Sequence, residues 1–284
     1  MKTLSIFFAL VVISLITSCQ SNPNQAMKEA LTFYASFDNG TDADYALGDK
    51  RIYTARSQKA ADSAVVGMLN PDHSIAQGEG KFGAAFRFGA KSDTVVFYKS
   101  KGNIAHNPTN WSGTVSFWLK VDPVKDLAPG FTDPIQITDV GYDDAAIWVD
   151  FTGENPRTFR LGVLGDKTEW LKDTLATSRR DEYARRLVPV KDLPFSGTSW
   201  THVGISYAGL GTAESIATLY LDGKKMGSIE GVDDPFNWEL DKSNIFVGIN
   251  FIGMMDELSI YNRPFSAEEV GQLYNLEGGV RSLL

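Results

Sequence analysis

The chain has 284 residues, a formal charge of −8 from 27 basic and 35 acidic side chains, 12% aromatic residues and a single cysteine. This acidic balance argues against a nucleic-acid binder, which needs a basic surface to neutralise phosphates. One cysteine excludes an internal disulfide and a zinc site built from several thiolates, and the aromatic and glycine content excludes a disordered chain or a helical bundle.

The first residues have the pattern of a secretory leader. Lys2 supplies a positive charge, and the apolar run from Leu4 to Ile16 is shorter than the roughly 18 to 20 residues that a spanning helix needs. The run ends in Ile16-Thr17-Ser18-Cys19, which resembles the lipobox of bacterial lipoproteins. This resemblance implies cleavage after residue 18 and lipid on Cys19. The alternative is an ordinary signal peptide followed by a buried free thiol.

The lipobox resemblance sets the expected domain organisation and localisation. We predict a signal peptide over residues 1–18, a lipidated cysteine with a flexible tether over residues 19–30, and a single domain over residues 31–284. Several acyl chains would hold the protein to a membrane almost permanently. Because Gln20, and not the aspartate associated with inner-membrane retention, follows the cysteine, we expect a lipid anchor in the outer membrane or at the cell surface.

Beyond residue 30, apolar and polar residues alternate with a period of two, which predicts β-strands. The alternation is clearest in Leu31–Phe37 and Val115–Val121. Asp222-Gly223 stands between two strand-like runs and predicts a tight hairpin. Many short, evenly spaced strands predict an all-β sandwich of two antiparallel sheets. The further strand candidates are 84–88, 94–98, 134–140, 146–151, 158–164, 202–208, 216–221, 225–229, 244–249 and 254–261.

Two segments depart from this rhythm. Residues 167–192 combine a helix-like cluster with a run of charges, which predicts an insertion or long loop that serves function or is simply a solvated helical face. Ser266-Ala267-Glu268-Glu269 has the spacing of a capping box. We therefore expect one short amphipathic helix near the C-terminus, docked on the sandwich.

Six blocks of sequence stand out along the chain: Leu31–Asp38, Gly80–Phe88, Gly113–Lys120, Trp200–Val203, Leu219–Gly223 and Gly253–Ser266. In their types of residue and their order they resemble the laminin G-like jelly roll of the concanavalin A-like lectin/glucanase superfamily. This resemblance covers Leu31 to Asn275 and implies a jelly-roll sandwich, a fold that hosts lectins, hydrolases, lyases and structural modules alike.

The resemblance also suggests a metal site. The first and last strands of a jelly roll are neighbours, so Asp38 and Asp256 are expected to converge. Related jelly rolls often bind a structural calcium ion there, and Ca²⁺ favours oxygen ligands. The alternative is a set of solvated turn carboxylates.

Catalytic residues are not evident. Glycosidases of the superfamily usually place acids as Glu-x-Asp-x-x-Glu, and no such triplet occurs. Asp144 and Asp150 share one face of a predicted strand but lie roughly 20 Å apart along it, too far for one glycosidic bond. Gln136 matches the glutamine of the family's lyase motif, whereas Thr138 replaces its histidine. We therefore predict a protein that is not an enzyme.

Carbohydrate binding needs aromatic rings that stack on sugars and a few polar groups that hold hydroxyls. Each candidate aromatic has core packing as its alternative, so the hypothesis depends on the set. The candidates are Tyr142, Trp148, Trp170 and Trp238 for stacking, and Asp143, Asp144 and Arg179 for polar contacts.

We predict a surface-anchored lipoprotein that captures polysaccharide or oligosaccharide without cleaving it. The first alternative is a structural or protein-interaction module of the cell envelope that uses residues 167–192 as its contact; a flat apolar patch there would favour it. The second is a glycoside hydrolase or polysaccharide lyase; a cleft with two close carboxyls, one of raised pKa, would favour that activity.

Overall fold

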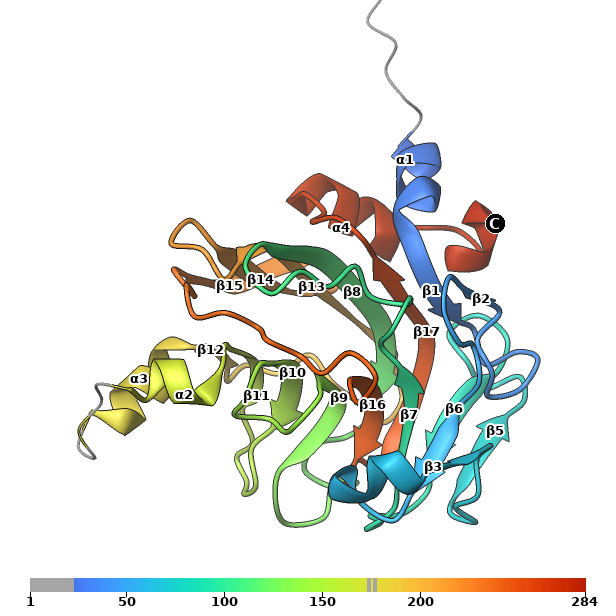
Figure 1. Cartoon of the computed structure of the whole chain (residues 1–284). Coiled ribbons are helices and arrows are strands. Elements are labelled where there is room, and N and C mark those ends of the chain that lie inside the picture. The colour runs from blue at the N-terminus through green and yellow to red at the C-terminus, as the bar shows by residue number, and fades with distance from the viewer. Residues whose placement is uncertain (1–22, 173–174, 176–177) are drawn as a thin grey trace, which may run out of the picture.

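Two antiparallel sheets packed face to face form the body of the chain in the computed structural model, which describes residues 23–172, 175 and 178–284 (Figure 1). Sheet A contains, in spatial order, β15 (Lys224–Glu230), β14 (Ile216–Leu221), β13 (Thr201–Leu210), β8 (Trp111–Lys120), β17 (Gly253–Tyr261), β1 (Leu31–Ala35) and β2 (Tyr45–Ala46), with β6 (Ala85–Phe88) paired to β17 and β5 (His73–Ala76) paired to β6. Sheet B contains β12 (Leu187–Val190), β11 (Phe159–Leu164), β10 (Ala146–Phe151), β9 (Thr132–Thr138), β16 (Asn244–Ile249), β7 (Val95–Lys99), β3 (Tyr53–Ala55) and β4 (Val65–Val66). The all-β sandwich predicted from the sequence is confirmed.

Strand periodicity sorts the side chains between the core and the outer faces. In β10, Ile147, Val149 and Phe151 enter the core between the sheets, so Trp148 and Asp150 lie on the outer face of sheet B. Strand β1 pairs with β17, as a jelly roll requires. The Asp222-Gly223 hairpin is also confirmed: both residues have positive φ, at 49° and 73°.

Helices cover the outer face of sheet A. A second apolar cluster forms there between the sheet, helix α1 (Pro23–Ala30), helix α4 (Ala267–Tyr274) and the 3-10 turn η2 (Val280–Leu283). Strand β1 is therefore buried on both faces, whereas its alternation predicted a half-buried strand. The predicted capping box of α4 is confirmed, since Ser266 Oγ accepts from the Glu269 N–H and Glu269 Oε2 accepts from the Ser266 N–H.

The N-terminal segment differs from the flexible tether predicted for residues 19–30. Residues 23–30 form α1, because Met27 and Ala30 reach the apolar cluster on sheet A and are buried there. Residues 1–18 and Cys19 lie outside the described residues. Within the described part of the chain, no helix combines the length and the apolar character needed to cross a bilayer.

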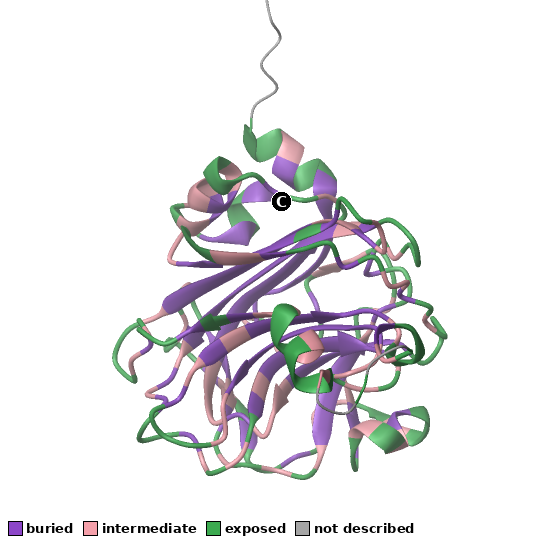
Figure 2. Cartoon of the chain, turned by 90° about the vertical axis from the view of Figure 1, so that its left-hand side faces the viewer, coloured by how far each residue is buried: buried purple, intermediate pink, exposed green. Residues whose placement is uncertain are grey.

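In the part of the chain that the structure describes, the elements that cover the outer face of sheet B lie at its sides. The 3-10 turn η1 (Gln58–Ser63) packs near β3 and β7, and the insertion at 167–192 forms helix α2 (Lys167–Trp170) and helix α3 (Arg179–Arg185) before its last part, β12, joins the sheet edge. The predicted helical character of the insertion is thus confirmed for its first part. Figure 2 shows mostly buried strands, with exposed residues gathered in helices and loops. The middle of this outer face, over β9 and β10, is left hollow.

Candidate functional site

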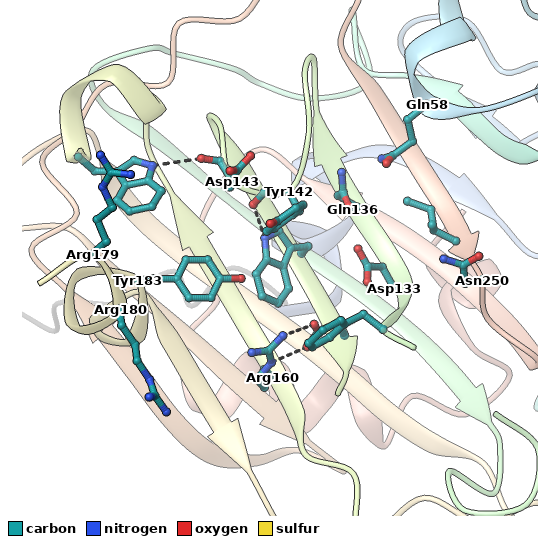
Figure 3. A pocket seen from close by; sticks show the side chains of 15 residues that line it. Gln58, Asp133, Gln136, Tyr142, Asp143, Arg160, Arg179, Arg180, Tyr183 and Asn250 are labelled. Atoms are coloured by element: carbon teal, nitrogen blue, oxygen red, sulfur yellow. Dashed lines mark hydrogen bonds and ion pairs between the residues drawn. The ribbon is translucent and has the colours of Figure 1, made fainter. Parts of the chain in front are cut away.

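A pocket of about 610 Å³ lies on the outer face of sheet B, between η1 on one side and helices α2 and α3 on the other (Figure 3). Strands β9, β10 and β11 provide its floor. The lining residues are Gln58, Phe131, Asp133, Gln136, Tyr142, Asp143, Trp148, Asp150, Arg160, Trp170, Arg179, Arg180, Tyr183, Ile249 and Asn250.

A buried ion pair forms the centre of the floor. Asp150 of β10 faces Arg160 of β11 directly across the ladder, and the two side chains form two bonds: Arg160 Nε donates to Asp150 Oδ1 at 2.8 Å and Nη2 donates to Oδ2. Only 5% of the Asp150 side chain and 15% of the Arg160 side chain are exposed. Burial raises the pKa of Asp150, and the Arg160 guanidinium opposes that rise. The pair therefore supplies fixed, opposite charges at the floor.

A second carboxyl lies beside this pair. Val149 pairs with Ile135 and Phe151 with Thr132, with an irregularity between them, so Asp133 lies next to Asp150 across the β9–β10 ladder. In the amide orientation that satisfies both atoms of Gln136, its Nε2 donates to Asp133 Oδ2 at 2.7 Å and its Oε1 accepts from Gln58 Nε2 at 2.8 Å. Burial and the charge of Asp150 raise the pKa of Asp133 well above its ordinary value. Asp133 therefore holds a proton more readily than an ordinary aspartate does.

Aromatic side chains line much of the remaining surface. Trp148 is almost fully buried, and its indole N–H donates to the Tyr142 carbonyl at 2.7 Å. The ring of Trp148 lies so close to Gly162 that a Cβ there would be 2.2 Å from its Cζ2 atom. Tyr142 and Phe131 are 53% and 55% exposed, so both rings are available at the rim.

The insertion contributes the far wall. The Trp170 indole N–H of α2 donates to the Asp143 carbonyl at 3.1 Å, which ties the insertion to the loop after β9. Lys167 pairs with the Asp143 carboxylate. From α3, Tyr183 is half-buried, and burial raises the pKa of its phenol. Arg179 and Arg180 are exposed at the rim.

The structure brings five of the seven predicted binding residues to this pocket: Tyr142, Asp143, Trp148, Trp170 and Arg179. It does not bring Asp144 or Trp238 there. Asp144 Oδ1 instead accepts from the Lys167 N–H at 2.8 Å. Trp238 stacks on His106, with ring centroids 4.3 Å apart, and donates to the Ala145 carbonyl at 2.6 Å. Both residues therefore have structural contacts outside the pocket.

Sequence reasoning missed several pocket residues, among them Asp133, Arg160, Arg180 and Tyr183, while it noted Gln136 and Asp150 without assigning them to the site. A signal existed for some of them. Arg160 interrupts the apolar run of β11 at an outward position, as Asp150 does in β10. A charged residue inside an otherwise apolar strand indicates either an ion pair or a site on the outer face.

The predicted metal ligands, Asp38 and Asp256, do converge on one segment, the turn at residues 80–84. Asp38 Oδ1 accepts from the Ala84 N–H at 2.8 Å and Oδ2 from Arg281 Nη1 at 3.0 Å. Asp256 Oδ2 accepts from the Phe82 N–H at 3.0 Å and Oδ1 from the Glu257 N–H at 2.7 Å.

This donor set fits a calcium ion poorly, because every oxygen of the two carboxylates already accepts an N–H bond. Among the described residues, no group of three or more His, Cys, Asp or Glu side chains is placed to hold a metal ion. The contacts support anchoring of the turn, and bound calcium stays a prediction.

Comparison with known proteins agrees with the observed fold. A laminin G model described as the concanavalin A-like lectin/glucanases superfamily matches residues 90–271, which is more than half of the chain. No curated protein matches the chain in sequence.

Solved structures with similar coordinates include domain 4 of AbnA, a GH43 extracellular arabinanase from Geobacillus stearothermophilus, in complex with arabinotriose (17% identity, 86% of this chain and 97% of that chain covered, TM-score 0.46). The binding domain of Paraclostridial Mosquitocidal Protein 1 is 16% identical over 88% of this chain and 52% of that chain, with a TM-score of 0.52. The binding domain of Botulinum Neurotoxin DC in complex with SialylT is 11% identical over 93% of this chain and 53% of that chain, with a TM-score of 0.54. The chain thus spans about half the length of these two toxin chains, and at such identities the likeness shows the fold alone.

Proposed function

The chain belongs to the concanavalin A-like lectin/glucanases superfamily, and on that premise we propose that it binds carbohydrate in the pocket on sheet B. The observation that carries the proposal is the combination, in one hollow, of exposed rings at the rim (Phe131 and Tyr142) with charged groups fixed at the floor (Asp150 and Arg160). Rings stack on the CH faces of sugars, and fixed polar groups bond to hydroxyls. The volume of about 610 Å³ suits a short stretch of a glycan chain.

Titration calorimetry of the full chain, on glycans chosen from an array screen, tests the proposal. We expect Tyr142→Ala to weaken binding about tenfold or more, because one stacked ring contributes about 1–3 kcal/mol. Leu47→Ala is the matched control, since Leu47 is 61% exposed but does not line the pocket. Trp238→Ala is expected to lower stability and leave the affinity of the folded protein unchanged. If no glycan binds in the array screen or in calorimetry, the proposal is refuted.

The location of the domain is a separate part of the proposal. The lipobox sequence supports cleavage before Cys19, lipid attachment at this cysteine and a place in the outer membrane or at the cell surface. A fatty-acid analogue fed to cells should label the wild-type protein and leave Cys19→Ala unlabelled. Equal labelling of both proteins would contradict this assignment. An envelope protein that contacts the insertion also stays a prediction.

A second candidate, glycan cleavage, is favoured by one observation: Asp133 and Asp150 are neighbouring carboxyls in the pocket, and the pKa of Asp133 is raised. A protonated carboxyl beside a charged one is the arrangement with which glycosidases divide the acid role from the nucleophile or base role. Cleavage predicts that a bound glycan releases reducing ends with the wild type, and at least 100-fold more slowly with Asp133→Asn. A glycan that binds and is never shortened supports binding alone.

A further inference from the structure

The negative charges at the floor and inner wall of the pocket are balanced within the protein. Asp150 pairs with Arg160, and Asp143 pairs with Lys167. The third acid, Asp133, shares a hydrogen bond with the Gln136 amide, and its raised pKa favours the uncharged form. A ligand that enters the pocket therefore meets little uncompensated negative charge.

The arginines in helix α3 and directly after it differ in their ion pairs. Arg185 pairs with Glu182, and Arg186 pairs with both Glu182 and Asp234. Arg179 and Arg180, in contrast, are exposed, line the pocket, and form no ion pair with any residue that the structure describes. Figure 3 shows both side chains extending from α3 on the same side of the pocket as Tyr183. The uncompensated charge of the site is therefore positive, although the whole chain carries −8.

On the basis of the proposed carbohydrate function, we propose that the pocket selects acidic saccharides, whose carboxylate or sulfate groups bind Arg179 or Arg180 while the sugar ring lies against Tyr142. A guanidinium presents a planar fork of N–H donors that matches a carboxylate or a sulfate with two parallel bonds. The net negative charge of the chain repels anions at long range, so selection of an acidic sugar depends on these local contacts. A neutral sugar would use the rings and the floor and leave both arginines in water.

Calorimetry on the full chain with three galactose-based oligosaccharides tests this inference. The probes are an oligogalacturonate with carboxylates, a carrageenan oligosaccharide with sulfate esters, and a neutral galactan oligosaccharide. We expect at least one acidic probe to bind about 100-fold more tightly than the neutral one, because each charge-assisted contact is worth about a factor of ten. The two acidic arms identify whether a carboxylate or a sulfate is the preferred anion.

The variants separate charge recognition from folding. Arg179→Ala/Arg180→Ala should lose about 100-fold in affinity for the acidic probe and keep its melting temperature. Arg179→Lys/Arg180→Lys should recover part of the loss, since lysine restores the charge without the fork. Arg185→Ala is the control: it removes one positive charge from the same helix, where the double variant removes two, and Arg185 pairs with Glu182 and does not line the pocket. Its affinity should stay within about twofold of the wild type.

The outcomes distinguish this inference from the proposed function. Equal binding of the neutral and acidic probes, or equal losses in the double alanine variant and in Arg185→Ala, overturns the selection of acidic sugars and leaves carbohydrate binding in place. If neutral glycans bind and the acidic probes do not, the selection of acidic sugars is also refuted, while carbohydrate binding is kept. No binding of any glycan overturns both.

Discussion

The ion pair between Asp150 and Arg160 tests directly how far the pocket floor is shielded from water. Asp150→Asn keeps the shape of the side chain and removes its charge. The Arg160 guanidinium, whose side chain is 15% exposed, is then left without its anion. It also lies over two aromatic rings, with its central carbon 5.1 Å from the centroid of Phe131 and 5.5 Å from that of Trp148, so water reaches it from few directions.

The expected cost follows from that burial. Removal of one partner from a buried ion pair costs about 3–5 kcal/mol, because an uncompensated charge is left behind, whereas an exposed pair contributes about 0–1 kcal/mol. The small exposure of Arg160 places our expectation at the lower end, about 3 kcal/mol. Asp143→Asn is the matched control, because its partner Lys167 is 45% exposed; we expect it to cost less than about 1 kcal/mol.

Urea unfolding followed by tryptophan fluorescence measures both values, as a shift of the midpoint at an unchanged slope. A double variant, Asp150→Asn/Arg160→Met, replaces the whole pair by uncharged groups and should recover at least half of the loss. If Asp150→Asn is no more destabilising than Asp143→Asn, water screens the ion pair at the floor as strongly as it screens an exposed pair. The reasoning that treats its charges as fixed would then be wrong.

Three further predictions concern other parts of the chain. Burial lowers the pKa of His202 from 6.5 to about 3, so between these pH values the unfolded state binds a proton that the folded state does not. The stability that neutral His202 contributes is fully present above pH 6.5 and falls as the pH is lowered, by about 2 kcal/mol at pH 5. In His202→Gln, the free energy of unfolding should therefore change less steeply with pH. Because the oxygens of Asp38 and Asp256 accept N–H bonds, we expect EDTA to leave the melting temperature unchanged, and a fall of several degrees would instead support a bound calcium ion. Gly162→Ala should displace Trp148, lower stability by about 1–3 kcal/mol and weaken glycan binding; a crystal structure of the variant with Trp148 in place would contradict this.

The fold could be predicted because its signals are local. Alternation within one strand shows where strands lie, and the bounds expected for β10, β14 and β16 are those observed. Strands β2 and β4 are two residues long, which is too short to show an alternation of apolar and polar residues in the sequence. The helix at residues 23–30 was missed for a different reason: its sequence is polar, and its stability comes from the contacts of Met27 with a distant part of the chain.

The site could be predicted only in part, because periodicity gives the face of a strand and not its neighbours. The sequence pattern placed Asp144 and Asp150 on one face of a predicted strand. It contained no information on the register that sets Asp150 beside Arg160 on one side and beside Asp133 on the other. The prediction therefore compared Asp150 with Asp144 along a single strand, when the partners of Asp150 come from the two adjacent strands.

The position of the pocket follows from an asymmetry between the two outer faces of the sandwich. On sheet A, α1, α4 and η2 bury an apolar cluster, so these elements occupy the outer face over β1 and β17. On sheet B, polar residues stand at outward positions of the central strands, and small elements cover only the two sides. The insertion between β11 and β12 thus adds a wall and two exposed arginines to a floor that the strands already provide. Exchange of α3 alone is therefore expected to change which sugar binds, whereas substitutions in β10 should change whether any sugar binds.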